Sequence, residues 1–268
     1  MGLIGNQKTL LVPLCCRAAE AESVHPIISD PWAVRILRHL DFDCHELQIP
    51  QKTRVMLCMR AKQFDRWVAR FMERTSGGTV IQLGCGLDSR FARMDDGRIH
   101  WYDLDMPEVV RMRRRFFPPT KRYHLIPSSV TEHSWMETLP VGRGPFLVVA
   151  EGLFMYLREE EVRSLILTLR DNLGEYDLAF DAYGKLTART IGAHPSIRST
   201  GGSVRWGLGG PHELEVWDEG IQLEEEWFFT ESQELPLVGP AYRLAFSVAN
   251  LFGVAKRAHW LIYYRVRG

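Results

Sequence analysis

The chain has 268 residues, of which 46% are hydrophobic and 25% charged, an ordinary composition for a globular protein. Its 33 basic residues equal its 33 acidic residues, so its charge gives no reason to expect a nucleic-acid partner. The apolar runs fall short of the roughly 18 residues of a transmembrane helix, and we expect no membrane partner.

The cysteines are odd in number and lack paired CxxC spacing: Cys15, Cys16, Cys44, Cys58 and Cys85. This pattern favours reduced thiols in a cytoplasmic protein, without a disulfide. The histidines show no HxxxH or HxH spacing near carboxylates, so we expect no metal site.

Residues 1–75 are predicted to be helical, and Ser76-Gly77-Gly78 ends this segment. Apolar residues recur there at three- and four-residue spacing in three stretches: 10–22, 30–40 and 53–74. Asp30 followed by Pro31 is typical of a helix start, with a capping side chain before a proline in the first turn. We therefore predict a helical cap over residues 1–78 and a second unit over residues 79–268.

Strands alternate with helices after residue 78. The predicted strands are 79–83, 99–104, 123–127, 145–152, 176–184, 222–230 and 256–266, and the predicted helices are 106–117, 159–173 and one around 241–252. This alternation predicts an α/β fold with a mostly parallel, doubly wound, Rossmann-like sheet of seven strands, whose last two strands are antiparallel. Ligands of such sheets bind beyond the carboxyl ends of the strands.

The first strand runs into a glycine turn, TVIQLGCG, that can bind a nucleoside cofactor. Gly84 and Gly86 leave room for a ligand to approach the backbone. Asp105 or Asp103 follows about 20 residues later, where a carboxylate can accept hydrogen bonds from ribose hydroxyls. Ser89 replaces the third glycine of a dinucleotide motif, which favours S-adenosylmethionine over NAD. The alternative is an ordinary strand–helix turn.

The stretch 184–220 interrupts the alternation and is predicted to form a lid after strand five, at the ligand edge, although it could be a simple excursion. His194 and His212 are candidates for a general base there. Arg198 and Arg205 are candidates for holding an anionic substrate, and Arg205 could instead belong to a segment that anchors the lid.

Several motifs together resemble the leucine carboxyl methyltransferase superfamily. They are VIQLGCGLDSRF, WYDLDMPEVVRMRRRFF, VVAEGLFMYL and FDAYGKL, with PLCCRAAE, DPWAV, CMRAKQFDRWV and RWGL outside the sheet strands. The chain is most similar to the TcmP-like O-methyltransferase branch, which is associated with polyketide tailoring. The resemblance implies a class I S-adenosylmethionine-dependent methyltransferase that releases S-adenosylhomocysteine.

The resemblance also implies cofactor-binding roles. It assigns the cofactor carboxylate to Arg60, the methionine moiety to Gly84 in the Gly84–Gly86 turn, and the ribose to Asp105. It places Ser129 and Val130 around the adenine, and Glu151 at the end of the fourth strand.

The residue chemistry agrees with these roles but leaves alternatives open. A planar guanidinium such as that of Arg60 matches a carboxylate in two places, although an arginine on a helix is otherwise a surface residue. Glu151 follows an apolar strand and needs a partner there, either the cofactor's ammonium or an arginine such as Arg158 or Arg163. Asp105 could alternatively cap the next helix.

We therefore expect an O-methyltransferase that acts on a carboxyl or hydroxyl oxygen of a small molecule. Tyr156 could contact substrate or cofactor, or act in catalysis, or simply pack in the core. One alternative is methylation of a protein's C-terminal carboxylate. Another is a protein that binds S-adenosylmethionine or NAD without transferring methyl groups.

Overall fold

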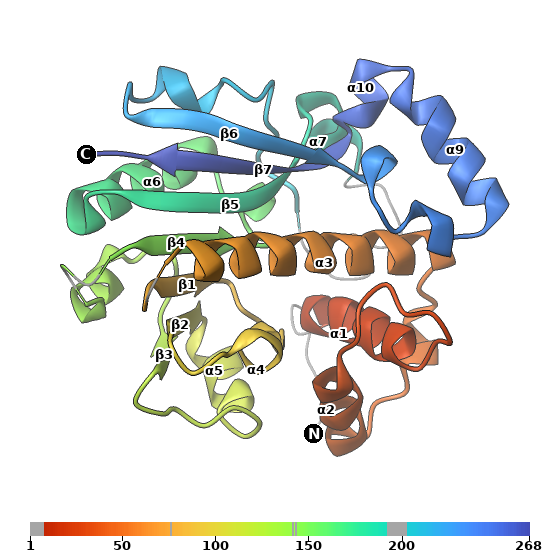
Figure 1. The fold of residues 1–268 in the computed structure, drawn as a ribbon, viewed down its shortest axis with the longest axis horizontal. Coiled ribbons are helices and arrows are strands. Elements are labelled where there is room, and N and C mark those ends of the chain that lie inside the picture. The colour runs from red at the N-terminus through yellow and green to blue at the C-terminus, as the bar shows by residue number, and fades with distance from the viewer. Residues whose placement is uncertain (1–7, 76, 141, 143, 192–202) are drawn as a thin grey trace.

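The computed structural model describes residues 8–75, 77–140, 142, 144–191 and 203–268. They form a sheet covered by helices (Figure 1). The strands are β1 (Thr79–Leu83), β2 (His100–Asp105), β3 (Tyr123–Pro127), β4 (Phe146–Ala150), β5 (Tyr176–Tyr183), β6 (Ile221–Phe228) and β7 (His259–Val266). They lie in the order β3-β2-β1-β4-β5-β7-β6. Neighbours among β1 to β5 are parallel, and β7 is antiparallel to both β5 and β6. The α/β fold predicted from the alternation is confirmed.

The helices are α1 (Lys8–Ala21), α2 (Pro31–Leu40), α3 (Gln51–Arg74), α4 (Arg90–Met94), α5 (Pro107–Arg113), α6 (Glu159–Leu173), α7 (Lys185–Ile191), α9 (Pro240–Asn250) and α10 (Gly253–Lys256). The predicted helices are present, although the one predicted over 106–117 ends at Arg113, and α4, α7 and α10 were not predicted. Short 3-10 helices include η2 (Cys44–Leu47), η3 (His133–Thr138), η4 (Phe154–Tyr156), η5 (Leu214–Val216), η6 (Phe229–Glu231) and η7 (Leu235–Leu237). Asp30 caps α2 as predicted, because its side chain accepts the N–H of Ala33. Within the described ranges, no helix combines the length and apolar character needed to cross a bilayer.

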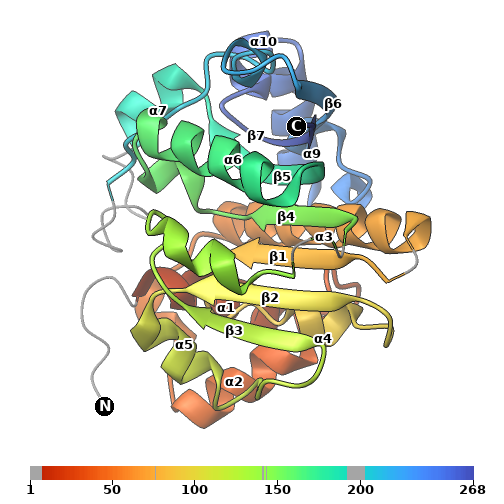
Figure 2. The same ribbon diagram turned by 90° about the vertical axis from the view of Figure 1, so that its left-hand side faces the viewer.

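The parallel strands end at one edge of the sheet (Figure 2). Their residues alternate between two cores: Val80 packs on the α3 side, and Ile81 packs on the α6 side. β7 runs the other way, so its first residue, His259, lies opposite Tyr183 at the end of β5. The carboxyl edge therefore collects side chains from strands of both directions.

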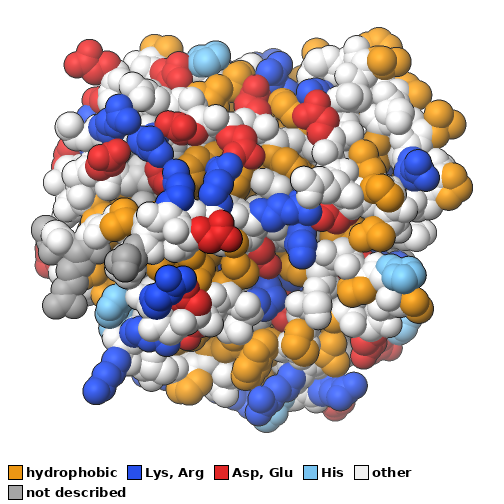
Figure 3. Space-filling model, viewed as in Figure 1, with side chains coloured by type: hydrophobic (Ala, Val, Ile, Leu, Met, Phe, Trp, Pro, Cys, Tyr) orange, Lys and Arg blue, Asp and Glu red, His pale blue; other side chains and the backbone are white. Residues whose placement is uncertain are grey.

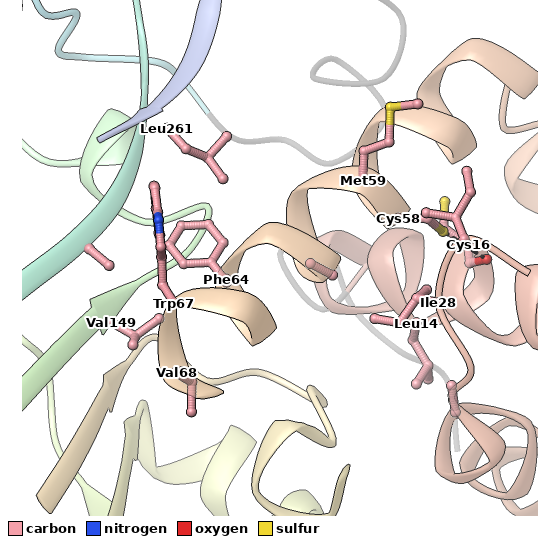
Figure 4. Packing of buried hydrophobic residues seen from close by; sticks show 14 of the residues in the cluster. Leu14, Cys16, Ile28, Cys58, Met59, Phe64, Trp67, Val68, Val149 and Leu261 are labelled. Atoms are coloured by element: carbon pink, nitrogen blue, oxygen red, sulfur yellow. Dashed lines mark hydrogen bonds between the residues drawn. The ribbon is translucent and has the colours of Figure 1, made fainter. Parts of the chain in front are cut away.

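Helix α3 joins the N-terminal helices to the sheet. Figure 4 shows Trp67 beside Val149 and Leu261 of the sheet. Cys58, nearer the N-terminus of the same helix, lies beside Cys16 of α1. These residues belong to one buried cluster, so the N-terminal helices share a core with the strands. The division into a cap and a methyltransferase unit stays a prediction.

Two further features lie beside the carboxyl edge, a hydrogen-bonded segment and an apolar surface. Residues 205–208 are held against η4 and the end of β5, because the N–H groups of Arg205 and Leu208 donate to the carbonyls of Met155 and Tyr183. Helices α9 and α10 and the turn between them leave large apolar side chains exposed on the right-hand side of the view in Figure 3: Leu244, Val248, Leu251, Phe252 and Val254.

The prediction that all cysteines are reduced is wrong in the structure. Cys15 on α1 and Cys44 in η2 form a disulfide with a Cα–Cα distance of 5.7 Å, and the other three cysteines are buried free thiols. The two partners are 29 residues apart in the chain. Their pairing depends on how η2 packs on α1, which cysteine spacing does not encode.

We expect the unfolded, unreduced protein to show three reactive thiols, and five after reduction, in a thiol titration. Reduction should lower the free energy of unfolding by about 3–4 kcal/mol, because the crosslink restricts a loop of roughly 30 residues in the unfolded chain. The Cys15→Ser variant is the matched control and should be insensitive to reductant. Five thiols before reduction would contradict the disulfide.

Candidate functional site

The turn after β1 and the end of β2 form one half of the site. Gly84 and Gly86 have φ values of 62° and 52°, in the left-handed region that favours glycine. The N–H of Gly86 donates to Asp105 Oδ2 over 2.7 Å, and the N–H of Met106 donates to Asp105 Oδ1 over 2.7 Å. Burial raises the pKa of the Asp105 carboxyl above its ordinary value. The turn and the acid are thus held together.

Asp103 has a different role. It is fully buried and accepts hydrogen bonds from Trp101 Nε1 at 2.8 Å and from the Tyr123 hydroxyl at 2.6 Å, and it pairs with Arg113. Arg113 also donates to the carbonyl of Gly86. Asp103 therefore supports the turn from inside, and Asp105 is the acid that remains half-buried at the edge.

The second half of the site is an ionic cluster at the ends of β4 and β5. Arg60 reaches it from α3, with Nε 2.9 Å from Glu151 Oε1 and Nη1 3.0 Å from Asp181 Oδ2. The N–H of Gly152 donates to the other oxygen of Asp181 over 2.6 Å. A Cβ at Gly152 would lie 3.3 Å from Arg60 Nη2, so the glycine lets the guanidinium approach the backbone. Arg60 is buried and is not a surface arginine.

The charges in this cluster stabilise one another. Burial opposes the charged form of Arg60, but Asp181 and Glu151 outweigh it and raise the pKa of the guanidinium. Burial also opposes ionisation of Asp181, but Arg60 and His259 lower its pKa to about 2. Both side chains are therefore ionised at neutral pH.

Glu151 has a second arginine partner. Arg90, at the start of α4, places Nη2 2.5 Å from Glu151 Oε2 and Nε 2.7 Å from Asp65 Oδ1 of α3. The sequence offered Arg158 or Arg163 as possible partners, and the structure uses Arg60 and Arg90 instead.

The ionic contacts continue into the N-terminal helices. Arg93 contacts both Asp65 and Asp30, and Arg17 of α1 lies 2.9 Å from Asp30. Arg17 also donates to the carbonyl of Leu87, just after the glycine turn. The helices before β1 thus hold both halves of the site.

Aromatic side chains surround the ionic cluster. His259 Nε2 lies 2.7 Å from Asp181 Oδ2, and its ring is 4.6 Å from the Tyr183 ring and 5.0 Å from the Phe229 ring. Tyr156, a candidate from the sequence, is half-buried near them. Burial raises its pKa, and Arg60 opposes the shift.

Other predicted residues lie around these two halves. Ser129 and Val130 follow β3, where Ser129 Oγ hydrogen bonds Thr131 and Val130 is buried. Apolar side chains lie over the glycine turn, because Cβ atoms at Gly84 and Gly86 would come within 3.0 Å of Leu153 and 3.2 Å of Leu10.

The candidates on the segment after β5 are not brought into the cluster. His212 is exposed and its Nδ1 lies 2.8 Å from Glu215 Oε2, while the Arg205 side chain is exposed. Trp206, beside Arg205, is buried in the core on the α6 side. His194 and Arg198 lie outside the described residues.

Sequence reasoning missed Asp181, Arg90 and His259. Asp181 is a carboxylate near the end of a buried strand, a signal similar to the one that identified Glu151, and could have been found by it. Arg90 and His259 carry no such signal, because one opens a short helix and the other begins an antiparallel strand. In the described part of the chain, no group of three or more potential ligand side chains could hold a metal ion.

Comparison of the sequence with known proteins shows its family. A family model described as leucine carboxyl methyltransferase matches residues 11–170. The tetracenomycin polyketide synthesis O-methyltransferase TcmP of Streptomyces glaucescens is 33% identical over 263 residues, which cover 98% of this chain and 97% of that protein. The S-adenosyl-L-methionine-dependent methyltransferase dpfgK of Gibberella zeae is 30% identical over 249 residues, covering 84% and 83%.

Among solved structures, a duf574 family protein from Streptomyces avermitilis has a TM-score of 0.58 at 13% identity, covering 94% of this chain and 97% of that one. Magnesium protoporphyrin IX methyltransferase from Synechocystis, solved with S-adenosylhomocysteine, has a TM-score of 0.50 at 11% identity, covering 89% and 95%. At these identities, the structural similarity concerns the fold. From the family model and these two relatives, the chain belongs to the leucine carboxyl methyltransferase family.

Proposed function

We propose that this protein is an S-adenosylmethionine-dependent O-methyltransferase that methylates a carboxyl or hydroxyl oxygen of a small molecule, such as a polyketide or another secondary metabolite. The observation that carries this proposal is the buried Arg60–Glu151–Asp181 cluster beside the glycine turn and Asp105. Membership in the methyltransferase family supports it. TcmP is named for an O-methylation in polyketide synthesis, and dpfgK for S-adenosylmethionine dependence.

The ionic cluster fits the amino-acid end of S-adenosylmethionine. That end carries a carboxylate and an ammonium, and the cluster presents a guanidinium between two carboxylates. Arg60 donates Nε and Nη1 to Glu151 and Asp181, and a guanidinium has further N–H donors for a carboxylate. Glu151 and Asp181 are acceptors suited to an ammonium. We assign the methionine end of the cofactor to these residues.

The glycine turn fits the nucleoside end. Asp105 uses one lone pair of each oxygen for the N–H groups of Gly86 and Met106, and each oxygen can accept one more hydrogen bond. Two free acceptor positions suit the two neighbouring hydroxyls of a ribose. Ser129 and Val130, after the adjacent strand β3, are assigned to the adenine. Leu10 and Leu153 would then line the cofactor.

The chemistry divides between cofactor and protein. S-adenosylmethionine supplies an electrophilic methyl group on a sulfonium. The protein's residues hold the two reactants in line and exclude water, which are the main requirements of such a displacement. We propose that Tyr156 and Arg205, near η4, face the acceptor, with His194 and Arg198 as further candidates.

A cytoplasmic location stays a prediction. Because disulfides are rare in cytoplasmic proteins, the Cys15–Cys44 disulfide makes cell fractionation a useful test of that location.

Cofactor choice is tested by isothermal titration calorimetry with S-adenosylmethionine, S-adenosylhomocysteine and NAD. We expect both sulfur compounds to bind and NAD not to bind, because the turn lacks the third glycine of a dinucleotide motif. Binding of NAD alone would refute the proposal. Binding of the sulfur compounds without turnover of any acceptor would favour a protein that has lost methyl transfer.

Arg60→Lys should weaken S-adenosylhomocysteine binding by about 1–3 kcal/mol, because the variant keeps the charge but loses the planar fork. Lysine is preferable to alanine, since loss of the cation would leave Glu151 and Asp181 buried without it. Arg163→Lys, on the exposed face of α6, is the matched control and should bind normally. Calorimetry gives the affinities and thermal unfolding confirms the fold. Equal affinity in both variants would remove Arg60 from the site.

Asp105→Asn should weaken the same ligand by about 1–3 kcal/mol, because a carboxylate accepts ribose hydroxyls better than an amide does. Asp96→Asn is the control, since the Asp96 side chain contacts Arg98 at the surface, away from the turn. If Asp105→Asn also binds a deoxyribose analogue as tightly as wild type does, the ribose contact is confirmed as the lost interaction. An unchanged affinity for S-adenosylhomocysteine would place the ribose elsewhere.

A further inference from the structure

The connection between β6 and β7 carries an apolar surface that the rest of the described chain leaves uncovered. Residues 235–256 contain η7, α9 and α10 and include two charged residues, Arg243 and Lys256. Six large apolar side chains of this connection are between 49% and 78% exposed: Leu237, Leu244, Val248, Leu251, Phe252 and Val254. We call these six side chains the apolar face. Its extent distinguishes it from the single exposed apolar residues that are normal on a protein surface.

Helix α9 is apolar on two sides, and one of them has no partner in the described structure. Phe246 lies on the inner side, is 7% exposed and packs in the core cluster on the α3 side. On the outer side, four exposed residues follow one another at intervals of three, four and three positions: Ala241, Leu244, Val248 and Leu251. This spacing places them along one line of the helix, as in a seam between two packed helices. A helix that is apolar all round is normally buried.

The area of the surface is close to that of an interface. From their exposed fractions, the six side chains present on the order of 600 Å² of apolar surface, the upper end of the range for the largest patch on a monomer. Small apolar residues that are also exposed extend it: Pro236, Pro240, Ala241, Ala245 and Ala255. Stable complexes bury roughly 800 Å² per partner, so the extended surface approaches what a stable complex requires.

The charge of the surface favours a second copy of the chain as its partner. Nucleic acids and anionic lipid surfaces are bound by clusters of lysine and arginine. In this connection Lys256 is paired with Glu231, which leaves Arg243 as its one basic residue without an acidic partner in the described structure. A nearly uncharged face can meet its own copy without bringing like charges together, which would oppose association.

The composition and the order of the residues favour the same partner. Transient interfaces between different proteins are about as apolar as the rest of the surface, whereas homodimer interfaces are more apolar. The seam is also complementary to itself. In an antiparallel copy Ala241 would lie opposite Leu251, so a small residue would meet a large one, and Leu244 would lie opposite Val248.

We propose that the protein forms a two-fold symmetric dimer in which α9 and α10 pack against the same helices of a second copy, with the apolar face at the centre. Figure 1 shows α9 along the right-hand margin of the molecule, with no other element outside it. A second copy can therefore reach the seam without moving any other element. The proposal goes beyond the function proposed above and does not depend on it.

The mass of the full chain in solution is measured by sedimentation velocity and by light scattering after size exclusion. At about 50 µM protein we expect twice the chain mass of 30.9 kDa. Because the contact is apolar, raising sodium chloride from about 0.1 M to about 1 M should not dissociate the dimer. A wild type that stays at 30.9 kDa overturns the proposal, and so does a dimer that dissociates at the higher salt.

Val248→Glu and Leu251→Glu each place a carboxylate in the seam and should raise the dissociation constant of the dimer about 100-fold or more, because the charge would be buried without a partner. Val216→Glu is the matched control. Val216 is 85% exposed in η5, beside the start of β6, whereas α9 follows the end of that strand. This variant should stay dimeric. A dimer that persists in both seam variants would place the interface elsewhere and overturn the proposal.

Circular dichroism and thermal unfolding of each variant exclude loss of the fold, which is not expected because the altered side chains are exposed. Sedimentation with phosphatidylcholine vesicles and with vesicles that also contain phosphatidylglycerol tests a lipid surface as the partner. The dimeric wild type should stay in the supernatant, because its apolar face is covered. A monomeric wild type that sediments with the vesicles, and does so less in Val248→Glu, would overturn the proposal in favour of a membrane surface.

Discussion

The burial of one guanidinium between two carboxylates organises the carboxyl edge of this protein. Arg60 comes from the long helix α3, while Glu151 follows β4 and Asp181 lies near the end of the adjacent strand β5. Isolated charges at this depth would each cost several kcal/mol to desolvate, so each requires the others. Removing one member typically costs about 3–5 kcal/mol, because it leaves an uncompensated charge behind. The cluster therefore fixes how α3 lies on the sheet as well as the chemistry of the site.

The same ionic contacts explain why the N-terminal helices belong to the site. Arg90 connects Glu151 to Asp65, and Arg93 and Arg17 extend the contacts to Asp30 at the start of α2. Arginine is suited to this position because its fork serves two or three acceptors at once and stays charged. The apolar half of α3 adds a shared hydrophobic core with the strands. Polar and apolar packing together fix the positions of the glycine turn, Asp105 and the ionic cluster relative to one another.

The two halves of the site suit different parts of the proposed cofactor. The glycine turn and Asp105 suit a nucleoside, and the ionic cluster suits an amino-acid group. Asp181 connects the ionic cluster to the start of β7, because it contacts both Arg60 and His259.

The sequence by itself determined the fold class, the helix start at Asp30–Pro31, the glycine turn and the acids at strand ends, because these depend on local periodicity and on turn chemistry. Its family motifs also led to the hypothesis that Arg60, Asp105 and Glu151 bind the same cofactor. Only the tertiary structure decided that Arg60 is buried with Asp181, 121 residues away, and that His259 reaches the same edge from an antiparallel strand. It likewise paired Cys15 with Cys44 and buried Asp103 with Arg113. Such pairings depend on how distant segments pack, and no local pattern in the chain encodes that.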